Sequence, residues 1–306
     1  MASYRSNFGD LLEPGFKKIF DDAYQEEPEV YPQVFNVDSS SKQDEKYSGV
    51  TGFGLYHQTD EGAQINYDDP VQMYDVTLTH VKYTKGFKIS EELYEDDQYN
   101  VMKGKPAQMG RAARRSVETI TSNILNRAFN SSYADGGDGE ELCSTDHDRS
   151  DGGSAQSNAD SNGITLTDTN LETGMLAARQ QLDDRGMIIQ VNPDVLVVPL
   201  NLEKEARILV GSSGRPGTAD NDINVYQGKF KVVAWEYITV NDTIWFLIDK
   251  SQAKLLWLWR VKPEFKQDVA FDSGMALFKS RFRGVGGWTD WRGVWGSLGD
   301  GSSYSG

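Results

Sequence analysis

The most regular hydrophobic pattern in the chain lies between residues 106 and 129. Apolar residues recur there at intervals of three or four positions, at Met109, Ala113, Val117, Ile120, Ile124 and Ala128. This spacing places them along one face of an α-helix. Pro106 suits the first helical turn, because its missing N–H would be unpaired there in any case. We therefore expect a helix over Pro106–Phe129, roughly 35 Å long at about 1.5 Å per residue.

Shorter apolar runs predict β-strands. Val50–Tyr56 and Ala63–Tyr67 flank a glycine-containing loop and are typical of a β-hairpin. A two-stranded hairpin is only marginally stable in water, so we expect this one to lie on a neighbouring surface. Further strands are predicted within Tyr74–Ile89, Val195–Val198, Phe230–Trp235, Ile244–Ile248, Leu255–Trp259 and Val269–Phe282.

A second helix is indicated after residue 168. Thr169 and Glu172 form a capping-box pattern, and Gly186 can end a helix that runs to about Arg185. Strands and helices thus alternate without the regular spacing of βαβ units, which indicates the α+β class. Residues 211–224 are rich in Gly, Ser, Asp and Asn, and we expect a long loop there.

The first hundred residues lack a comparable pattern and hold most of the acidic excess. They carry 8 basic and 20 acidic side chains, and the whole chain has a formal charge of −15. Such a segment is not expected to bury enough apolar surface to fold on itself. Two interpretations stay open, an arm laid across another surface and a disordered tail. Isolated apolar anchors stand among the polar residues, at Leu11, Leu12, Phe16, Ile19, Phe20, Tyr24, Tyr31, Val34 and Phe35.

Composition argues against several classes of protein. A single cysteine rules out an intramolecular disulfide framework, and three histidines leave little material for a zinc centre. The sequence has no uncharged apolar run of the ~18 residues needed to cross a bilayer, and no signal peptide is visible. A sequence pI near 4.7 opposes general DNA binding, which depends on Lys and Arg contacts to phosphates.

Candidate chemistry is sparse. The aspartates within Asp146–Asp151 miss the spacing of an EF-hand, so a surface loop is favoured over a calcium site. Cys143 and His147 could form a catalytic couple, but their polar loop favours an incidental thiol. There is no G-x-S-x-G nucleophile motif. We predict neither enzymatic activity nor a cofactor.

Two groups of residues suggest contacts with other molecules. Trp288, Trp291 and Trp295 lie in a glycine-rich segment that argues against a helix, and they could be a core plug or an interface anchor. The arginines of the predicted helix avoid its apolar stripe, which favours a solvated face or acidic partners over a phosphate-binding row. We add the hypothesis that a neighbouring subunit's acidic arm lies near them. These arginines are Arg111, Arg114, Arg115 and Arg127.

Several short segments keep the same order as in a known family. They are Leu11–Phe16, Lys17–Phe20, Asp22–Tyr24, Tyr83–Phe87, Asp96–Tyr99, Leu125–Phe129, Leu142–Thr145, Asn221–Asn224, Thr243–Phe246 and Gly287–Gly293. Each match alone is weak, but the ordered set spreads over most of the chain. Together the segments resemble Mu-like major head subunits, the major capsid proteins of tailed bacteriophages with the Hong Kong 97 phage-like fold.

The resemblance implies an α+β chain whose parts serve assembly. The expected parts are an N-terminal arm at 1–46, an extended β-hairpin loop at 47–85, a peripheral domain at 86–165 with its spine helix at 106–129, an axial domain at 166–258, and a return to the peripheral domain with a C-terminal tail at 259–306. The implied function is self-assembly of hexamers and pentamers into an icosahedral head shell around double-stranded DNA. The loop at 211–224 would lie near the centre of a capsomer.

The resemblance also implies partners. These are further copies of the chain, a portal, a separate scaffolding protein and a decoration protein, with DNA enclosed without sequence-specific contacts and no membrane. The protein would reside in the virion after assembly in the bacterial cytoplasm. We expect subunit contacts at Leu11, Phe16, Phe20, Tyr24, Tyr31, Phe35, Phe53, Tyr56, Ile65, Tyr67, Arg111, Arg115, Arg215, Asn221, Trp288 and Trp291.

Two alternative functions remain at this point. One is another virion structural protein, such as a decoration or tail-tube protein, and the other is an acidic soluble hydrolase. The predicted arm and hairpin favour the capsid interpretation over an enzyme, because an enzyme would need neither.

Overall fold

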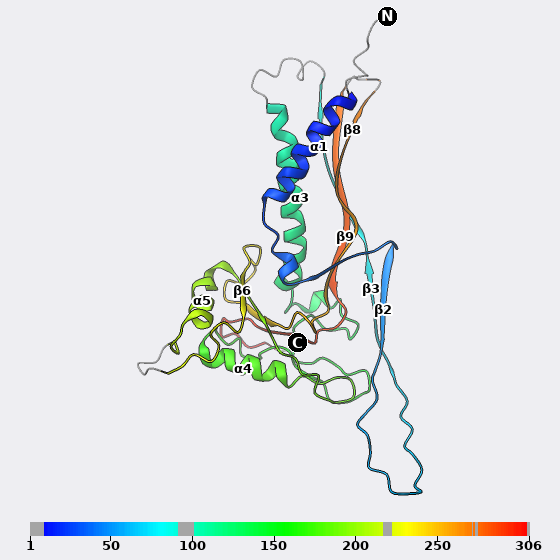
Figure 1. The fold of residues 1–306 in the computed structure, drawn as a ribbon, viewed down its shortest axis with the longest axis vertical. Coiled ribbons are helices and arrows are strands. Elements are labelled where there is room, and N and C mark those ends of the chain that lie inside the picture. Colours follow the sequence, from blue (N-terminus) through cyan, green and yellow to red (C-terminus); the bar gives the residue numbers. More distant parts are fainter. Residues whose placement is uncertain (1–8, 91–100, 217–221, 271, 273–274, 305–306) are drawn as a thin grey trace, which may run out of the picture.

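The computed structural model describes residues 9–90, 101–216, 222–270, 272 and 275–304, without the side chains of residues 9–14 and 101–103. The molecule is elongated (Figure 1). Two helices and a long-stranded sheet form one end, and a compact part of short strands and helices forms the other. A β-hairpin projects beside the compact part, away from the helices.

The long predicted helix is present as α3 (Val101–Asn126). Its apolar stripe is confirmed, because Met109, Ala113 and Val117 are buried. The predicted start was wrong, since the helix begins before Pro106 and contains it. The missing N–H of a proline removes one intrahelical hydrogen bond, a loss that the remaining turns of this long helix outweigh.

The N-terminal segment folds onto the chain itself, which corrects the expectation that it could not. It forms α1 (Gly9–Glu26), which lies along α3 (Figure 1). Phe16, Phe20 and Ala23 are buried, at spacings of four and three that fit one face of a helix. A Cβ at Gly110 of α3 would lie 2.4 Å from the Phe20 carbonyl oxygen, so the two helix backbones are in close contact.

A four-stranded sheet runs beside these helices in the order β1-β8-β9-β4. β8 (Leu255–Val269) and β9 (Ala276–Trp288) form a long antiparallel hairpin. β4 (Val81–Ile89) pairs antiparallel with β9, and β1 (Asn36–Ser39) pairs parallel with β8. Both strands of the long hairpin were predicted only in part, since the run predicted at Val269–Phe282 begins in β8, crosses the turn and covers only the first half of β9. β8 extends well beyond its predicted run, because its second half carries charged residues that hide the apolar pattern.

A second four-stranded sheet forms the compact part, in the order β10-β7-β5-β6. β5 (Val195–Val198), β7 (Trp245–Ile248) and β10 (Val294–Ser297) are buried at every position. β5 pairs parallel with β6 (Lys231–Ala234), and the other pairs are antiparallel. The predicted strands at β5, β6 and β7 are confirmed.

Two helices belong to this compact part, α4 (Asp168–Arg179) and α5 (Glu203–Gly211). The predicted cap of α4 was two residues late. Thr167 is the N-cap, in an extended conformation, and its side chain accepts a hydrogen bond from the Asn170 N–H. The helix also ends several residues before the predicted position. Short 3₁₀ turns are η2 (Tyr31–Gln33), η3 (Ser131–Tyr133) and η4 (Leu200–Leu202).

The projecting hairpin consists of β2 (Asp44–Val50) and β3 (Gln72–Thr79). The strands predicted at Val50–Tyr56 and Ala63–Tyr67 are wrong, because residues 51–71 form no strand. The ladder becomes irregular at the end that residues 51–71 connect, where the register shifts between Ser48 and Val50. Beyond that point, glycines and the absence of a partner surface leave little to sustain pairing.

The cores explain how these parts are joined. The main core takes Phe35 from the N-terminal segment, Leu125 from α3, Trp257 from β8 and Ile248 from β7, so it spans both sheets. A second core lies between α4, α5 and the short-stranded sheet, and a third between α1, α3 and the far end of the long sheet. Among the described residues, no helix combines the length and hydropathy of a membrane span.

Candidate assembly surfaces

Residues 51–71, here called the projecting loop, carry apolar side chains that the chain itself does not bury. From Phe53 to Tyr67, the exposed fractions of the large apolar side chains run from 61 to 105 %. A concentration of exposed apolar side chains marks an interaction surface. The predicted contacts at Phe53, Tyr56, Ile65 and Tyr67 are all exposed, together with Leu55.

The base of the projecting loop is fixed to the body of the molecule. The Thr51 N–H donates to the Val71 carbonyl oxygen at 2.8 Å, and the Val71 N–H donates to Thr51 Oγ1 at 2.9 Å. Arg185, beyond α4, lies 3.2 Å from Asp68 Oδ1 and donates through Nε to the Gly52 carbonyl oxygen at 3.2 Å. The loop is therefore held in place at its base while its tip lies in solvent.

Most of the other predicted contact aromatics are instead part of the chain's own cores. Phe20 and Phe35 are fully buried, and Tyr31 stacks edge-on against Trp257 with ring centroids 6.2 Å apart. They fill core space because α1 and η2 fold back over α3, which the acidic composition did not suggest. The predicted contact residues with this outcome are Phe16, Phe20, Tyr31, Phe35, Trp288 and Trp291.

The tryptophan segment is a core element. It leaves β9, turns, and enters β10 without a helix, as its glycines predicted. Gly293 has a positive φ of 84°, and a Cβ there would lie 2.6 Å from the Ala253 backbone nitrogen. Both the conformation and the space therefore require glycine at this turn. Of the two open interpretations, the core plug is confirmed.

Three helix arginines pair with acidic residues of the same chain, and the hypothesis of a neighbour's arm stays a prediction. The end of α1 and the segment after it place three glutamates beside α3, and each accepts from one arginine. The interpretation that the helix arginines are partners for acidic groups is confirmed. Arg111 and Arg115 are therefore already engaged within the chain. The pairs are Arg111–Glu26, Arg114–Glu29 and Arg115–Glu27.

Tyr24 and Arg215 are partly covered by neighbouring groups. The Arg114 guanidinium lies 3.9 Å from the centroid of the Tyr24 ring, and burial raises the pKa of the Tyr24 hydroxyl. Arg215 Nε lies 2.8 Å from Asp168 Oδ2 at the start of α4. Two further predicted contacts, the Leu11 side chain and Asn221, lie outside the described residues.

A second surface was missed in the sequence. One face of the long sheet packs against α1 and α3 through Phe265 and Phe278. The register places six cationic residues on the opposite face, of which four are exposed and two half-buried. Lys279, Arg281 and Arg283 alternate with buried residues along β9, and this alternation was the available signal. The cations of this basic sheet face are Lys82, Lys88, Lys266, Lys279, Arg281 and Arg283.

Cations on the basic sheet face lie close enough to repel one another. Lys82 lies directly opposite Arg283, and Lys266 directly opposite Lys279. Like charges in directly opposed positions destabilise a sheet. Arg281 is partly neutralised by an ion pair with Glu264. The face therefore has an excess of positive charge in a chain whose formal charge is −15.

The candidate chemical groups do not assemble into a reactive site. The Cys143 thiol is fully buried, and burial raises its pKa. Both ring nitrogens of His147 contact other residues, Asp138 and Asn158, instead of the thiol. Within the described residues, no group of three or more His, Cys, Asp or Glu side chains is placed to hold a metal ion.

Comparisons with known proteins agree with this architecture. A family model described as "Phage capsid protein" matches residues 74–297. The capsid protein of bacteriophage JBD30 superimposes with a TM-score of 0.58 at 16 % identity, covering 70 % of this chain and 92 % of that chain. The capsid of the native GTA particle gives a TM-score of 0.56 at 12 % identity, covering 87 % of this chain and 88 % of that chain.

The procapsid of bacteriophage JBD30 extends the comparison to nearly the whole chain. It matches with a TM-score of 0.50 at 19 % identity, covering 95 % of this chain and 75 % of that chain. At such identities the likeness concerns the fold. No curated protein matches the chain.

Proposed function

The chain belongs to the phage capsid protein family and is a shell-forming major capsid protein; we propose that its subunits form hexamers and pentamers by laying the projecting loop across neighbouring copies. The exposure of Phe53 and Tyr56 carries this proposal, because the free subunit leaves them unburied. Burying one large apolar side chain contributes about 1.5–3 kcal/mol. Contacts of that size, repeated around a closed shell, add up to a stable container.

The surface that receives the loop is proposed to be the basic sheet face of the neighbouring copy. The projecting loop carries Asp60, Glu61, Asp68 and Asp69, so its charge is opposite to that of the face. An acidic partner would relieve the repulsion between directly opposed cations, such as Lys266 and Lys279.

Two observations favour a protein segment as the partner of this face. Lysine on an edge strand commonly discourages unwanted pairing, but Lys279 and Arg283 lie on β9, an inner strand of the sheet. Leu277 is exposed on the same face as these cations, near the end of the β8–β9 hairpin. A mixed acidic and apolar loop matches that surface better than a nucleic acid backbone does.

The first experiment tests the function. The wild-type chain is expressed alone and its assembly is followed by sedimentation and electron microscopy, with shells or capsomers expected. The double variant Phe53→Ser/Tyr56→Ser is expected to remain as folded subunits, because it removes exposed contact area and no core packing. Gln64→Ser is the control in the same loop and is expected to assemble normally. A double variant that assembles like the wild type would remove the loop from the proposal.

The second experiment tests the receiving surface. Lys266→Glu/Lys279→Glu is expected to block assembly, and combining it with Asp60→Lys/Glu61→Lys is expected to restore assembly in part. If assembly is unaffected by the first pair, the receiving surface is wrong while the function stands. If the first pair instead abolishes binding of a DNA duplex by the subunit and leaves assembly intact, the face is a DNA contact.

The remaining partners are proposed at the level of the whole particle. A capsid of bacteriophage JBD30 is decorated with minor capsid protein trimers, which supports proposing a decoration protein here. A portal, a separate scaffolding protein, enclosed double-stranded DNA and assembly in the host cytoplasm are proposed from the family resemblance. Co-expression with the neighbouring genes of the same phage, followed by analysis of purified particles, tests which of these proteins join the shell.

A further inference from the structure

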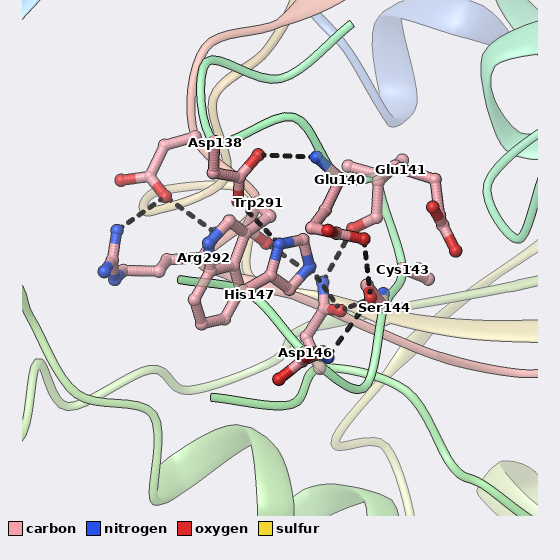
Figure 2. A network of polar contacts seen from close by, with 12 residues as sticks. Asp138, Glu140, Glu141, Cys143, Ser144, Asp146, His147, Trp291 and Arg292 are labelled. Carbon is pink, nitrogen blue, oxygen red and sulfur yellow. Dashed lines mark hydrogen bonds and ion pairs between the residues drawn. The ribbon is translucent and has the colours of Figure 1, made fainter. Parts of the chain in front are cut away.

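A buried histidine occupies the long loop between α3 and α4. The His147 side chain has no exposed surface, and its ring stacks on that of Trp291, with centroids 4.3 Å apart and an interplanar angle of 8° (Figure 2). Trp291 belongs to the turn between β9 of the long sheet and β10 of the short-stranded sheet. His147 therefore connects the loop to the point where the two sheets meet.

Both ring nitrogens of His147 face acceptor atoms. Nδ1 lies 2.7 Å from Asp138 Oδ2, a carboxylate oxygen. Nε2 lies 3.0 Å from Asn158 Oδ1. A neutral imidazole has one donor and one acceptor nitrogen, so beside an ionised Asp138 it could satisfy only one of these two contacts.

The orientation of the Asn158 amide determines whether His147 Nε2 faces an acceptor or a donor, because a flipped amide would present its NH₂ group to Nε2. Asn158 Nδ2 donates to the Leu142 carbonyl oxygen at 2.8 Å. Asn158 Oδ1 accepts from the Ser144 N–H at 2.9 Å. Flipping the amide would set oxygen against oxygen and N–H against N–H, so both bonds would be lost. Oδ1 therefore faces His147, and Nε2 must donate.

We propose that His147 is held as an imidazolium, with a proton on each ring nitrogen, and that this cation locks the loop between α3 and α4 onto the turn at Trp291. The arrangement suits a cation, because Asp138 supplies a carboxylate and the Trp291 ring supplies a π-face. Removing one proton would leave the Nε2 lone pair facing Asn158 Oδ1 inside the protein, a repulsive contact between two buried acceptors.

Acidic groups of the same loop face the ring, and burial is the main cause of the raised pKa of the Glu140 carboxyl. The Arg292 guanidinium lies 4.7 Å from the centroid of the Trp291 ring and is itself paired with Asp184 and Asp290. The titratable and charged groups around His147 are Asp138, Glu140, Glu141, Cys143, Asp146, Asp184, Asp290, Arg292 and Tyr304.

The first test measures the protonation of the two His147 ring nitrogens directly. The chain contains three histidines, so magic-angle-spinning NMR of shells labelled with ¹⁵N-histidine gives few signals, and His147→Gln identifies those of His147. Both His147 nitrogens are expected to have the shifts of protonated nitrogen at about pH 6. A single protonated nitrogen at pH 6 overturns the proposal.

The second test measures how readily the loop between α3 and α4 opens, through the reactivity of Cys143, the single cysteine of the chain. Cys143 lies in the same loop, so its labelling rate by a thiol reagent reports loop opening. His147→Gln, which carries no charge and bridges the two acceptors less well, is expected to label about tenfold faster than the wild type at pH 6.

Measuring both rates at the same pH removes the reagent's own dependence on thiolate. Asp146→Asn alters an exposed neighbour in the same loop and should label like the wild type. A variant that labels no faster than the wild type contradicts the proposal, and the NMR result remains decisive if the variant does not fold.

Discussion

Glu118 shows how a single buried carboxylate ties distant parts of this chain together. It lies on α3, and Oε1 accepts from the Val30 N–H at 2.9 Å while Oε2 accepts from Trp235 Nε1 at 3.0 Å. Oε2 also lies 3.3 Å from the Tyr31 nitrogen. The segments that follow α1 and β6 are thus joined to the same side chain. In the sequence, Glu118 gave no signal beyond its position next to the apolar stripe.

Replacing Glu118 by glutamine tests this connection. The amide keeps one acceptor oxygen but turns its NH₂ toward a buried N–H donor, so Glu118→Gln is expected to lower the free energy of unfolding by about 2–3 kcal/mol. Chemical denaturation of the unassembled subunit measures the change. Glu236→Gln, at an exposed position, is the matched control and should stay within about 0.5 kcal/mol of the wild type. Equal effects of the two substitutions would show that the Glu118 contacts contribute nothing.

The same carboxylate predicts a dependence on pH. Burial raises the pKa of Glu118 above its ordinary value of 4.5, so the folded chain takes up this proton at a higher pH than the unfolded chain does. The contribution of Glu118 therefore becomes more favourable as the pH falls toward and below its folded pKa. The stability of the wild type relative to Glu118→Gln should rise between about pH 7 and pH 4.5. A difference that is flat or falls over this range would contradict the sign.

At the scale of elements, the packing of α1 on α3 decides how the N-terminal third is used. The aromatic side chains of α1 enter the core between the helices and the sheet, where Phe16 meets Phe278 edge-on at 5.7 Å and Phe20 lies 5.5 Å from Phe265, between ring centroids. The sequence contained the helical spacing of these residues. Its acidic composition nevertheless favoured an arm on another surface, because composition does not reveal whether a partner helix is available within the chain.

Truncating one aromatic side chain measures this packing. Phe20 is fully buried, so Phe20→Ala is expected to lower the free energy of unfolding by about 3–5 kcal/mol through lost burial and a residual cavity. Lys18→Ala, on the exposed side of α1, should change it by less than about 0.5 kcal/mol. Urea denaturation of both variants provides the comparison. If Phe20 instead contacts only other subunits, its truncation will impair assembly and leave the subunit's stability unchanged.

At the scale of the whole molecule, the body and the projecting loop have different roles. Two four-stranded sheets and the helices share continuous cores, whereas residues 51–71 project beyond them with their apolar side chains in solvent (Figure 1). A folded subunit can therefore be complete in its core and incomplete at its surface. This separation agrees with a subunit that is stable alone and reaches its final contacts only in a shell.

Removing the loop tests this division of roles. Replacing residues 52–70 by a short Gly/Ser linker is expected to change the free energy of unfolding by less than about 1 kcal/mol, since the loop buries little apolar area and a shorter connection has a small entropic effect. Assembly is expected to be lost. Denaturation and sedimentation of the same preparation separate the two effects. A shortened chain that unfolds far more readily would show that the loop supports the subunit's own fold.

The sequence by itself determined the α+β class, the long helix and most strands, because each depends on the local spacing of apolar residues. The ordered resemblance to head subunits, now supported by the family match to residues 74–297, also came from the sequence alone. Tertiary structure decided which aromatic side chains lie in the core, which acidic residues pair with the helix arginines, and which cations share the basic sheet face. Those outcomes depend on strand register and on the packing of α1 along α3, which bring together residues that are far apart in the chain. Local sequence patterns do not predict such long-range contacts.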